Sequence, residues 1–349
     1  MAAERRINFA LIGTGSIARV HAQAVAAVPS ACLRGVHGRN PERSRELATE
    51  FGGEAFGSLE ALLSVPEIDA VCITTPSGLH GAHAIAALEA GKHVLCEKPL
   101  EITTRRIDEM MAAARRHQRI LAGVFQFRFG RGAQLLKRAI EAGRFGRLSL
   151  CSAYVKWWRA PDYYRASTWR GTAALDGGGA LINQAIHAID LLQWLAGRPT
   201  RVHAATRTRA HPIEVEDTAA AVLEFEHGAL GVVEAATSCY PGQQLRIEIS
   251  GEHGTAILEN DRLVRWQFAT PEPGDDERCR ETTHVIGGGA ADPKAIGIEG
   301  HRRIVEDLVH AILAGSPPAV PPEDARHAVA IIEAIYESSR LGRPVAVGS

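Results

Sequence analysis

The chain has 349 residues, 46% of them apolar and 23% charged, a composition typical of a globular protein long enough for two domains. Lys and Arg number 39 against 40 for Asp and Glu, so the formal net charge of −1 gives no electrostatic reason to expect nucleic acid or an anionic membrane as a partner. No apolar run reaches the roughly 18 residues of a membrane span. Segment 1–13 lacks the apolar region of a signal peptide, so we expect a cytoplasmic protein with no membrane partner.

Metal binding is not expected from the sequence. The six cysteines are widely scattered and form no Cys-x-x-Cys pair, which indicates reduced thiols that serve mostly as small core residues. His80 and His83 have an i,i+3 spacing that suits a metal ion, but neither thiolates nor carboxylates accompany them. We therefore predict no metal.

The first third of the chain alternates short apolar strands with amphipathic helices. Strands are expected at 7–13, 32–37, 68–74, 93–96 and 119–124. Helices are expected up to Val28 and at 40–51, 81–90 and 103–117. Alternation at this pace indicates parallel strands with crossover helices, and so a doubly wound Rossmann domain over residues 1–124.

After residue 124 the pattern changes to period-two strands. Strands are expected at 148–157, 219–225, 230–236, 245–250 and 255–258, and helices at 132–142, 180–195, 300–314 and 325–341. The predicted fold class is therefore α/β, with a C-terminal α+β domain (125–349) built on a large, mostly antiparallel open sheet. Apolar residues on its open face predict a homodimer or homotetramer, and the long segment 270–298 is expected to be mobile or functional.

A glycine-rich turn ends the first strand. Gly13-Thr14-Gly15-Ser16-Ile17-Ala18 has the form G-x-G-x-x-A between a strand and a helix, the context that a dinucleotide site requires. The first glycine permits the tight turn, the second admits the pyrophosphate, and N–H groups at Ser16 and Ile17 would hold the phosphates.

The end of the second strand bears on the choice between NAD and NADP. An NAD site usually carries an acid there for the ribose 2′-hydroxyl, whereas this chain has Gly38 followed by Arg39, with Arg43 one helical turn later. Two cations without a carboxylate suit a 2′-phosphate, so NADP is slightly favoured over NAD.

Three further motifs carry a family resemblance. They are TTPSGLH at 74–80, Glu97-Lys98-Pro99 after the fourth strand, and GGGALINQAIHAID at 177–190. Together with the glycine turn they resemble the Gfo/Idh/MocA family of glucose-fructose oxidoreductase and inositol dehydrogenase, over essentially the whole chain. The resemblance implies an enzyme that moves hydride between NAD(P) and a secondary alcohol or ketone of a sugar, sugar nucleotide or polyol.

The chemistry of the residues agrees with the resemblance. Oxidising an alcohol requires a base for the hydroxyl proton, and His187 is suited to this because the ordinary pKa of histidine is about 6.5. The resemblance implies that His187 is the acid/base and that Lys98 positions the nicotinamide ribose and the substrate hydroxyl. On a regular helix Asn183, His187 and Asp190 share one stripe. Asp190 would then either polarise His187 or make a structural hydrogen bond.

One position departs from the inositol-dehydrogenase pattern. That pattern has an aspartate four residues before the histidine, where this chain has Asn183. An amide cannot take a proton, so Asn183 can only orient the substrate or the imidazole. This variant resembles the branch that oxidises nucleotide-linked amino-sugar uronates at C3.

Further residues are candidates for ligand contacts. By resemblance, the cofactor side includes Thr75, Pro76, His80, Glu97 and Gln126, with helix capping as the alternative for His80. The substrate-side candidates are aromatic and cationic residues, which suit sugar faces, hydroxyls and phosphates, with plain packing or subunit contact as the alternative: Arg128, Tyr154, Lys156, Tyr163, Trp169 and Arg170. The triple glycine Gly177–Gly179 is costly in conformational entropy, which predicts a close backbone approach there.

Other classes of protein fit less well. A non-catalytic sensor of the same fold is the main alternative, and the presence of both Lys98 and His187 speaks against it. A short-chain dehydrogenase needs a Tyr-x-x-x-Lys pair on one helix, which is missing. A methyltransferase would account for the glycine turn alone.

Overall fold

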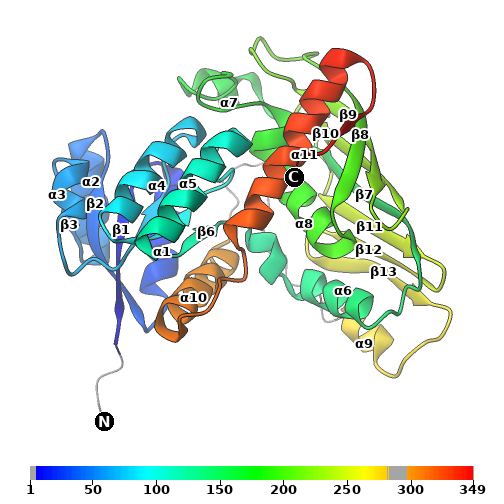
Figure 1. The fold of residues 1–349 in the computed structure, drawn as a ribbon, viewed down its shortest axis with the longest axis horizontal. Coiled ribbons are helices and arrows are strands. Elements are labelled where there is room, and N and C mark those ends of the chain that lie inside the picture. Colours follow the sequence, from blue (N-terminus) through cyan, green and yellow to red (C-terminus); the bar gives the residue numbers. More distant parts are fainter. Residues whose placement is uncertain (1–4, 281, 283–296, 349) are drawn as a thin grey trace. The chain divides into compact units, whose positions relative to one another are not determined.

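The computed structural model describes residues 5–280, 282 and 297–348, and the chain divides into two compact units (Figure 1). The first unit joins the chain up to Gln126 with 297–326, and the second joins 127–296 with the part from His327 onward. The sequence placed the first boundary at 124, two residues earlier. It assigned 297–326 to the C-terminal domain, whereas this segment packs with the first unit, because amphipathicity shows that a helix has a buried face but not what covers it.

The first unit contains a six-stranded parallel sheet with strand order β3-β2-β1-β4-β5-β6, which confirms the predicted doubly wound arrangement. The strands are β1 (Ile7–Ile12), β2 (Ala31–His37), β3 (Glu54–Ala55), β4 (Ala70–Ile73), β5 (His93–Cys96) and β6 (Leu121–Gly123). All four residues of β4 are buried, as expected of a strand covered on both faces. Of these strands, only the two-residue β3 was not predicted.

Helices cover both faces of this sheet. They are α1 (Ser16–Ala26), α2 (Pro41–Phe51), α3 (Leu59–Leu63), α4 (His80–Glu89), α5 (Thr104–His117) and α10 (Glu299–Ala314), with the short 3-10 turn η1 (Ser77–Leu79) before α4. The Asn40 side chain accepts hydrogen bonds from the first-turn N–H groups of α2, as its position before a proline predicted. Right-handed crossovers put α1 and α2 on the face opposite α4 and α5, and α10 packs beside α1 (Figure 1).

The second unit contains an eight-stranded sheet with order β13-β12-β11-β7-β10-β9-β8-β14. The strands are β7 (Leu148–Lys156), β8 (Pro199–Arg207), β9 (Thr218–Phe225), β10 (Leu230–Ala236), β11 (Arg246–Gly251), β12 (Gly254–Glu259), β13 (Arg262–Phe268) and β14 (Val345–Ala346). All neighbours are antiparallel except β7 and β10, so the predicted mostly antiparallel sheet is confirmed. Strands β8, β13 and β14 were not predicted; in β8 the inward positions after Val202 are only Ala204 and Thr206, which are small and half-buried and give little hydrophobic alternation in the sequence.

The helices of the second unit differ from the prediction at one important place. They are η2 (Gln126–Phe129, begun by the last residue of the first unit), α6 (Arg131–Glu141), α7 (Pro161–Arg165), η3 (Ala180–Ala185), α8 (Ile186–Ala196), α9 (Asp275–Arg280) and α11 (Pro322–Leu341). The predicted helix 180–195 begins as the π-helix η3, so a regular 3.6-residue repeat does not relate Asn183 to His187. Within the segment 270–298, α9 is helical, while 281 and 283–296 lie outside the described residues.

One face of the second sheet is open. Alternation along β7 buries Ala153 and Val155, while Leu150 is 56% exposed on the opposite face and pairs in register with Leu230 of β10, which is 48% exposed. Neighbouring Val222 of β9 adds to the apolar character of that face. Among the described residues, no helix is both long and apolar enough to cross a membrane.

A histidine at the start of β5 makes the stability of the first unit depend on pH. His93 Nδ1 accepts a hydrogen bond from Ile120 N–H at 3.0 Å, which only the unprotonated nitrogen can do. Burial, reinforced by the positive charge of Arg119, lowers the pKa of His93 from 6.5 to about 4. Between these pH values His93 binds a proton in the unfolded chain but not in the folded chain. The free energy of unfolding therefore falls as the pH drops from 6.5 to about 4.

We therefore expect His93→Asn, which keeps an acceptor oxygen but does not titrate, to flatten this decline. Denaturant unfolding at several pH values measures the slope, with the exposed His203→Asn as the control. An unchanged slope in His93→Asn would show that other groups carry the acid sensitivity.

Candidate functional site

The glycine turn leaves room at the start of α1. Gly13 has φ +113°, and a Cβ there would lie 2.6 Å from Thr74 Oγ1, so this position requires glycine for the fold itself. A Cβ at Gly15 would meet nothing within 4 Å. Gly15 and Ser16 are exposed and Ile17 is half-buried, while Ala18 is fully buried. The second glycine is thus not needed by the protein's own packing, which fits a backbone surface kept open for a pyrophosphate.

The end of β2 leaves little room for a side chain at the position of the usual acid. A Cβ at Gly38 would lie 2.7 Å from Thr14 Cγ2, in the glycine turn itself. Arg39 and Arg43 are both exposed on the loop and first turn that follow. The close contact explains the glycine, and the two guanidinium groups stay available to an anion.

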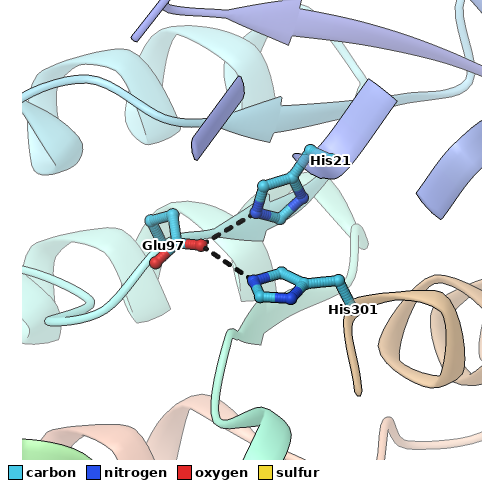
Figure 2. A group of neighbouring side chains, drawn as sticks. All are labelled: His21, Glu97 and His301. Carbon is cyan, nitrogen blue, oxygen red and sulfur yellow. Dashed lines mark hydrogen bonds and ion pairs between the residues drawn. The ribbon is translucent and has the colours of Figure 1, made fainter. Parts of the chain in front are cut away.

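Glu97, the first residue after β5, is buried and contacts two histidines from distant elements (Figure 2). Its Oε1 lies 2.9 Å from His21 Nε2 on α1 and 3.6 Å from His301 Nε2 on α10. Its Oε2 accepts a hydrogen bond from Lys98 N–H at 3.1 Å. Burial alone would raise the pKa of Glu97, but the two histidines hold it well below its ordinary value, so the carboxylate stays ionised.

The ligand atoms of His21, Glu97 and His301 lie within 4.8 Å of one another, which makes this group a candidate metal site on geometry alone. The sequence prediction of no metal considered only the scattered cysteines and the pair His80 and His83, since nothing in the sequence brings residues 21, 97 and 301 together.

His80 contacts the backbone of the segment that follows β5 and contains Lys98. One of its ring nitrogens lies 2.8 Å from the Pro99 carbonyl oxygen, and the other lies 2.9 Å from the Thr75 carbonyl oxygen. Burial lowers the pKa of His80, although the two carbonyls oppose the shift. Thr75 Oγ1 is 3.1 Å from His83 Nδ1. The ring of His80 therefore bridges two backbone carbonyls, and its contact with the cofactor ribose stays a prediction.

The remaining predicted cofactor residues lie at the carboxyl ends of β4, β5 and β6. Lys98 and Pro76 are half-buried, and Gln126 has a buried Oε1 with no hydrogen-bond partner among the described residues. In a doubly wound sheet this edge is where ligands bind.

The triple glycine of the second unit makes the close backbone approach that the sequence predicted. Gly177 has φ +78°. A Cβ at Gly178 would lie 2.0 Å from Tyr336 Oη, and one at Gly179 would lie 1.8 Å from the Glu216 carbonyl oxygen. The Glu216 carboxylate also accepts hydrogen bonds from Gly179 N–H at 3.0 Å and Leu181 N–H at 2.8 Å. This anchor holds the start of the π-helix that carries Asn183.

Asn183 belongs to a polar network. Its Nδ2 donates to Asp176 Oδ1, and its Oδ1 accepts a hydrogen bond of 2.7 Å from Gln184 Nε2. Gln184 in turn contacts the Tyr163 hydroxyl at 2.9 Å, and its Oε1 accepts from Arg159 Nη2 at 2.7 Å. Asn183 and Tyr163 were predicted site residues, whereas Asp176, Gln184 and Arg159 were not.

Cations and aromatic rings gather beside this network. The Arg170 guanidinium lies 4.5 Å from the Tyr163 ring centre and 5.4 Å from that of Trp169. Arg159, whose side chain is buried, lies 5.5 Å from the same Tyr163 ring. The structure thus brings predicted Tyr163, Trp169 and Arg170 together.

His187 lies in the first turn of α8 and is 7% exposed. Its ring packs edge-on against Phe127, with ring centres 5.0 Å apart. Asp190 accepts two hydrogen bonds from the Arg128 guanidinium, at 2.8 Å and 2.6 Å, and both side chains are buried. Asp190 thus makes a structural ion pair, and a polarising effect of Asp190 on His187 stays a prediction. Arg128, predicted to bind substrate, carries this ion pair, and a substrate contact from it stays a prediction.

Two predicted substrate residues lie elsewhere in the second unit. Tyr154 and Lys156 point to the open face of β7, opposite Val155, and Lys156 Nζ is 2.7 Å from Glu234 Oε2. This placement separates them from Asn183, so it does not support a shared substrate site.

The residues that the sequence analysis missed have a common feature. His21, His301 and Glu216 are buried and Tyr336 is half-buried, and all four contact partners far away in the chain. Only the triple glycine signalled that some residue must approach closely, without indicating which one.

Comparison with known proteins agrees with this geometry. Residues 7–125 match the family described as "Oxidoreductase family, NAD-binding Rossmann fold", and residues 133–257 match "GFO/IDH/MocA C-terminal domain". Levoglucosan dehydrogenase of Pseudarthrobacter phenanthrenivorans is 30% identical over 96% of each chain. Myo-inositol 2-dehydrogenase of Thermotoga maritima is 28% identical over 97% of this chain and 98% of its own. The solved structure of the WlbA dehydrogenase from Bordetella pertussis, in complex with NADH and UDP-GlcNAcA, matches with a TM-score of 0.91 and 34% identity over 100% of both chains.

Gly13 and Gly15 differ in the space around them, and this difference provides a test of whether the glycine turn binds the phosphates. Gly15→Ala places a methyl group where the protein has no atoms, so we expect normal stability and at least about tenfold weaker dinucleotide binding, which corresponds to about 1.4 kcal/mol. Gly13→Ala forces a residue with Cβ to a positive φ against Thr74, so we expect a stability loss of about 1–3 kcal/mol. Calorimetric titration and denaturant unfolding measure the two effects.

The exposed Gly57, where a Cβ would also meet nothing within 4 Å, is the matched control. Undiminished binding by Gly15→Ala would mean that the phosphates do not use this turn.

Proposed function

Because the chain belongs to the Gfo/Idh/MocA family of oxidoreductases, we propose that it is an NAD(P)-dependent dehydrogenase or reductase of a nucleotide-linked sugar uronate. The observation that carries the proposal is the open backbone at Gly15 above a doubly wound sheet, in a chain that retains both Lys98 and His187. The match with an NADH-bound dehydrogenase over the whole chain supports the same class of cofactor.

In this proposal the residues divide the chemistry between them. The bound nicotinamide supplies the hydride acceptor or donor. His187 takes the hydroxyl proton when the alcohol is oxidised and returns it when the ketone is reduced. Lys98 positions the nicotinamide ribose and the substrate hydroxyl, and its ammonium group stabilises negative charge that develops on the oxygen. Asn183 cannot take the proton, and it orients the substrate or the imidazole.

The surroundings of Asn183 support an anionic sugar as substrate. Arg159 and Arg170 flank the Tyr163 ring within 5.5 Å, and Gln184 connects this group to Asn183. A guanidinium group pairs well with a carboxylate or a phosphate, and an aromatic face packs against the C–H surface of a sugar. The WlbA dehydrogenase, bound to UDP-GlcNAcA, offers a precedent of this substrate class in a chain of 34% identity.

The open face of the second sheet supports a further part of the proposal. Leu150, Leu230 and Val222 lie exposed on adjacent strands, and covering them would remove apolar surface from water. We include in the proposal a homodimer or homotetramer formed through this face, which sedimentation of the purified chain tests.

We expect His187→Asn to lower kcat by about 10²–10⁴-fold while NADH affinity stays unchanged, because only the proton transfer is lost. Lys98→Met should lower kcat and also weaken cofactor binding. The measurement is NAD(P)H absorbance with a panel of sugar nucleotides, uronates and free sugars, alongside NADH titration. His203→Asn, exposed on β8, is the control. Absence of turnover by the wild-type chain across the panel would contradict the proposed function.

The choice of dinucleotide has its own test. Arg39 and Arg43 support a preference for NADP, and each Arg→Ala change should weaken NADP binding by about tenfold or more, with little effect on NAD. Calorimetry with both cofactors measures this, and exposed Arg45 on the same helix provides the control Arg45→Ala. Tighter binding of NAD by the wild type, or no effect of Arg39→Ala, would rule out the 2′-phosphate interpretation.

A further inference from the structure

We infer that His21 and His301 are positioning residues, which hold Lys98 in place through the carboxylate of Glu97. The inference rests on the proposed function in that it gives Lys98 a role in cofactor binding and catalysis. It adds two residues, one from the helix that begins at the glycine turn and one from a helix more than 200 positions further along the chain.

The geometry connects three elements at one carboxylate (Figure 2). Oε1 of Glu97 faces both Nε2 atoms, at 2.9 Å and 3.6 Å, and Oε2 accepts from the backbone N–H of Lys98 at 3.1 Å. The two imidazole rings meet edge to face, with centres 5.1 Å apart and planes at 83°. Rotation of the carboxylate would therefore break contacts on both sides, which fixes the backbone at Lys98.

The protonation of the two histidines follows from their other nitrogens. Nδ1 of His21 and Nδ1 of His301 are buried and have no hydrogen-bond partner among the described residues. A proton on either one would be a buried donor without an acceptor, which is costly, whereas a bare lone pair costs less. In both rings the hydrogen is therefore placed on Nε2, which is directed at Glu97.

The carboxylate of Glu97 lies in the interior, directly beside Lys98 in the chain. A buried charge is a poor way to gain stability, because an apolar cluster of similar volume would cost less desolvation. Hydrogen-bond donors from two sides reduce the cost of burying the carboxylate. A negative charge next to Lys98 helps to hold its ammonium group in a defined direction.

A matched pair of substitutions separates positioning from mere packing. His301→Gln keeps a neutral N–H donor at similar reach, whereas His301→Leu fills the space without a donor. His310→Leu, an exposed position on the same helix, is the control. His21→Gln and His21→Leu repeat the comparison from the side of α1.

The readouts are kcat and KM of the full-length chain, its NADH dissociation constant, its melting temperature and the metal content. We expect His301→Leu to lower kcat at least about tenfold with the sugar KM within about twofold, and His301→Gln to recover activity to within about threefold of wild type. Equal melting temperatures but unequal kcat for the two variants would support positioning. A kcat unchanged in His301→Leu, or stoichiometric zinc bound at the three side chains, would overturn it.

A separate readout keeps the inference testable if the substrate class is wrong. The rate at which trinitrobenzenesulfonate labels Lys98, followed by peptide mass spectrometry with and without NADH, requires no turnover. Labelling that changes in His301→Leu and returns in His301→Gln supports the network even where no sugar reacts. Labelling identical in wild type and His301→Leu contradicts it, whatever the substrate.

Discussion

A buried carboxylate that orients backbone is the interaction on which each unit of this protein depends. In the first unit Glu97 accepts from two histidines and from the N–H of Lys98. In the second unit Glu216 accepts from the N–H groups of Gly179 and Leu181. Each carboxylate lies beside a candidate catalytic segment, and each takes its donors from residues that would otherwise leave polar groups unsatisfied in the interior.

The two carboxylates differ in how their charge is maintained. Imidazole donors hold the pKa of Glu97 well below its ordinary value, despite burial. Burial dominates at Glu216 and raises its pKa, although two backbone N–H groups oppose the shift. The first unit thus keeps a firm negative charge next to a lysine, whereas the second uses its carboxylate mainly to hold the triple glycine and the π-helix. The difference fits the groups next to each carboxylate. A fixed negative charge stabilises the ammonium group of Lys98 and, in the proposed function, a cationic nicotinamide, whereas the amide of Asn183 carries no charge.

The sequence was sufficient for the parts of the structure that local pattern determines. Alternating strands and helices predicted the doubly wound sheet, and the glycine turn predicted the positions where a Cβ is excluded or would have free space. Contacts between distant segments were beyond this kind of inference. The buried face of α10 was evident, but its packing against α1, and so the approach of His301 to Glu97, depends on chain topology. Period-two alternation would have placed Tyr154 and Lys156 on the sheet face opposite Val155, yet composition alone grouped them with the other substrate candidates.

The environment of Asn183 explains why this chain carries an amide where inositol-dehydrogenase-like sequences carry an acid. Its amide group is used at both ends, because Nδ2 donates to Asp176 while Oδ1 accepts from Gln184. An aspartate here would remove the donor and set two carboxylates against each other, which raises the pKa of one of them. Asp176 is itself held by Gly171 N–H at 2.8 Å and is 1% exposed, so it cannot turn toward water. The amide at 183 and the acid at 176 therefore form a coupled pair, which in the proposed function leaves the proton transfer to His187 alone.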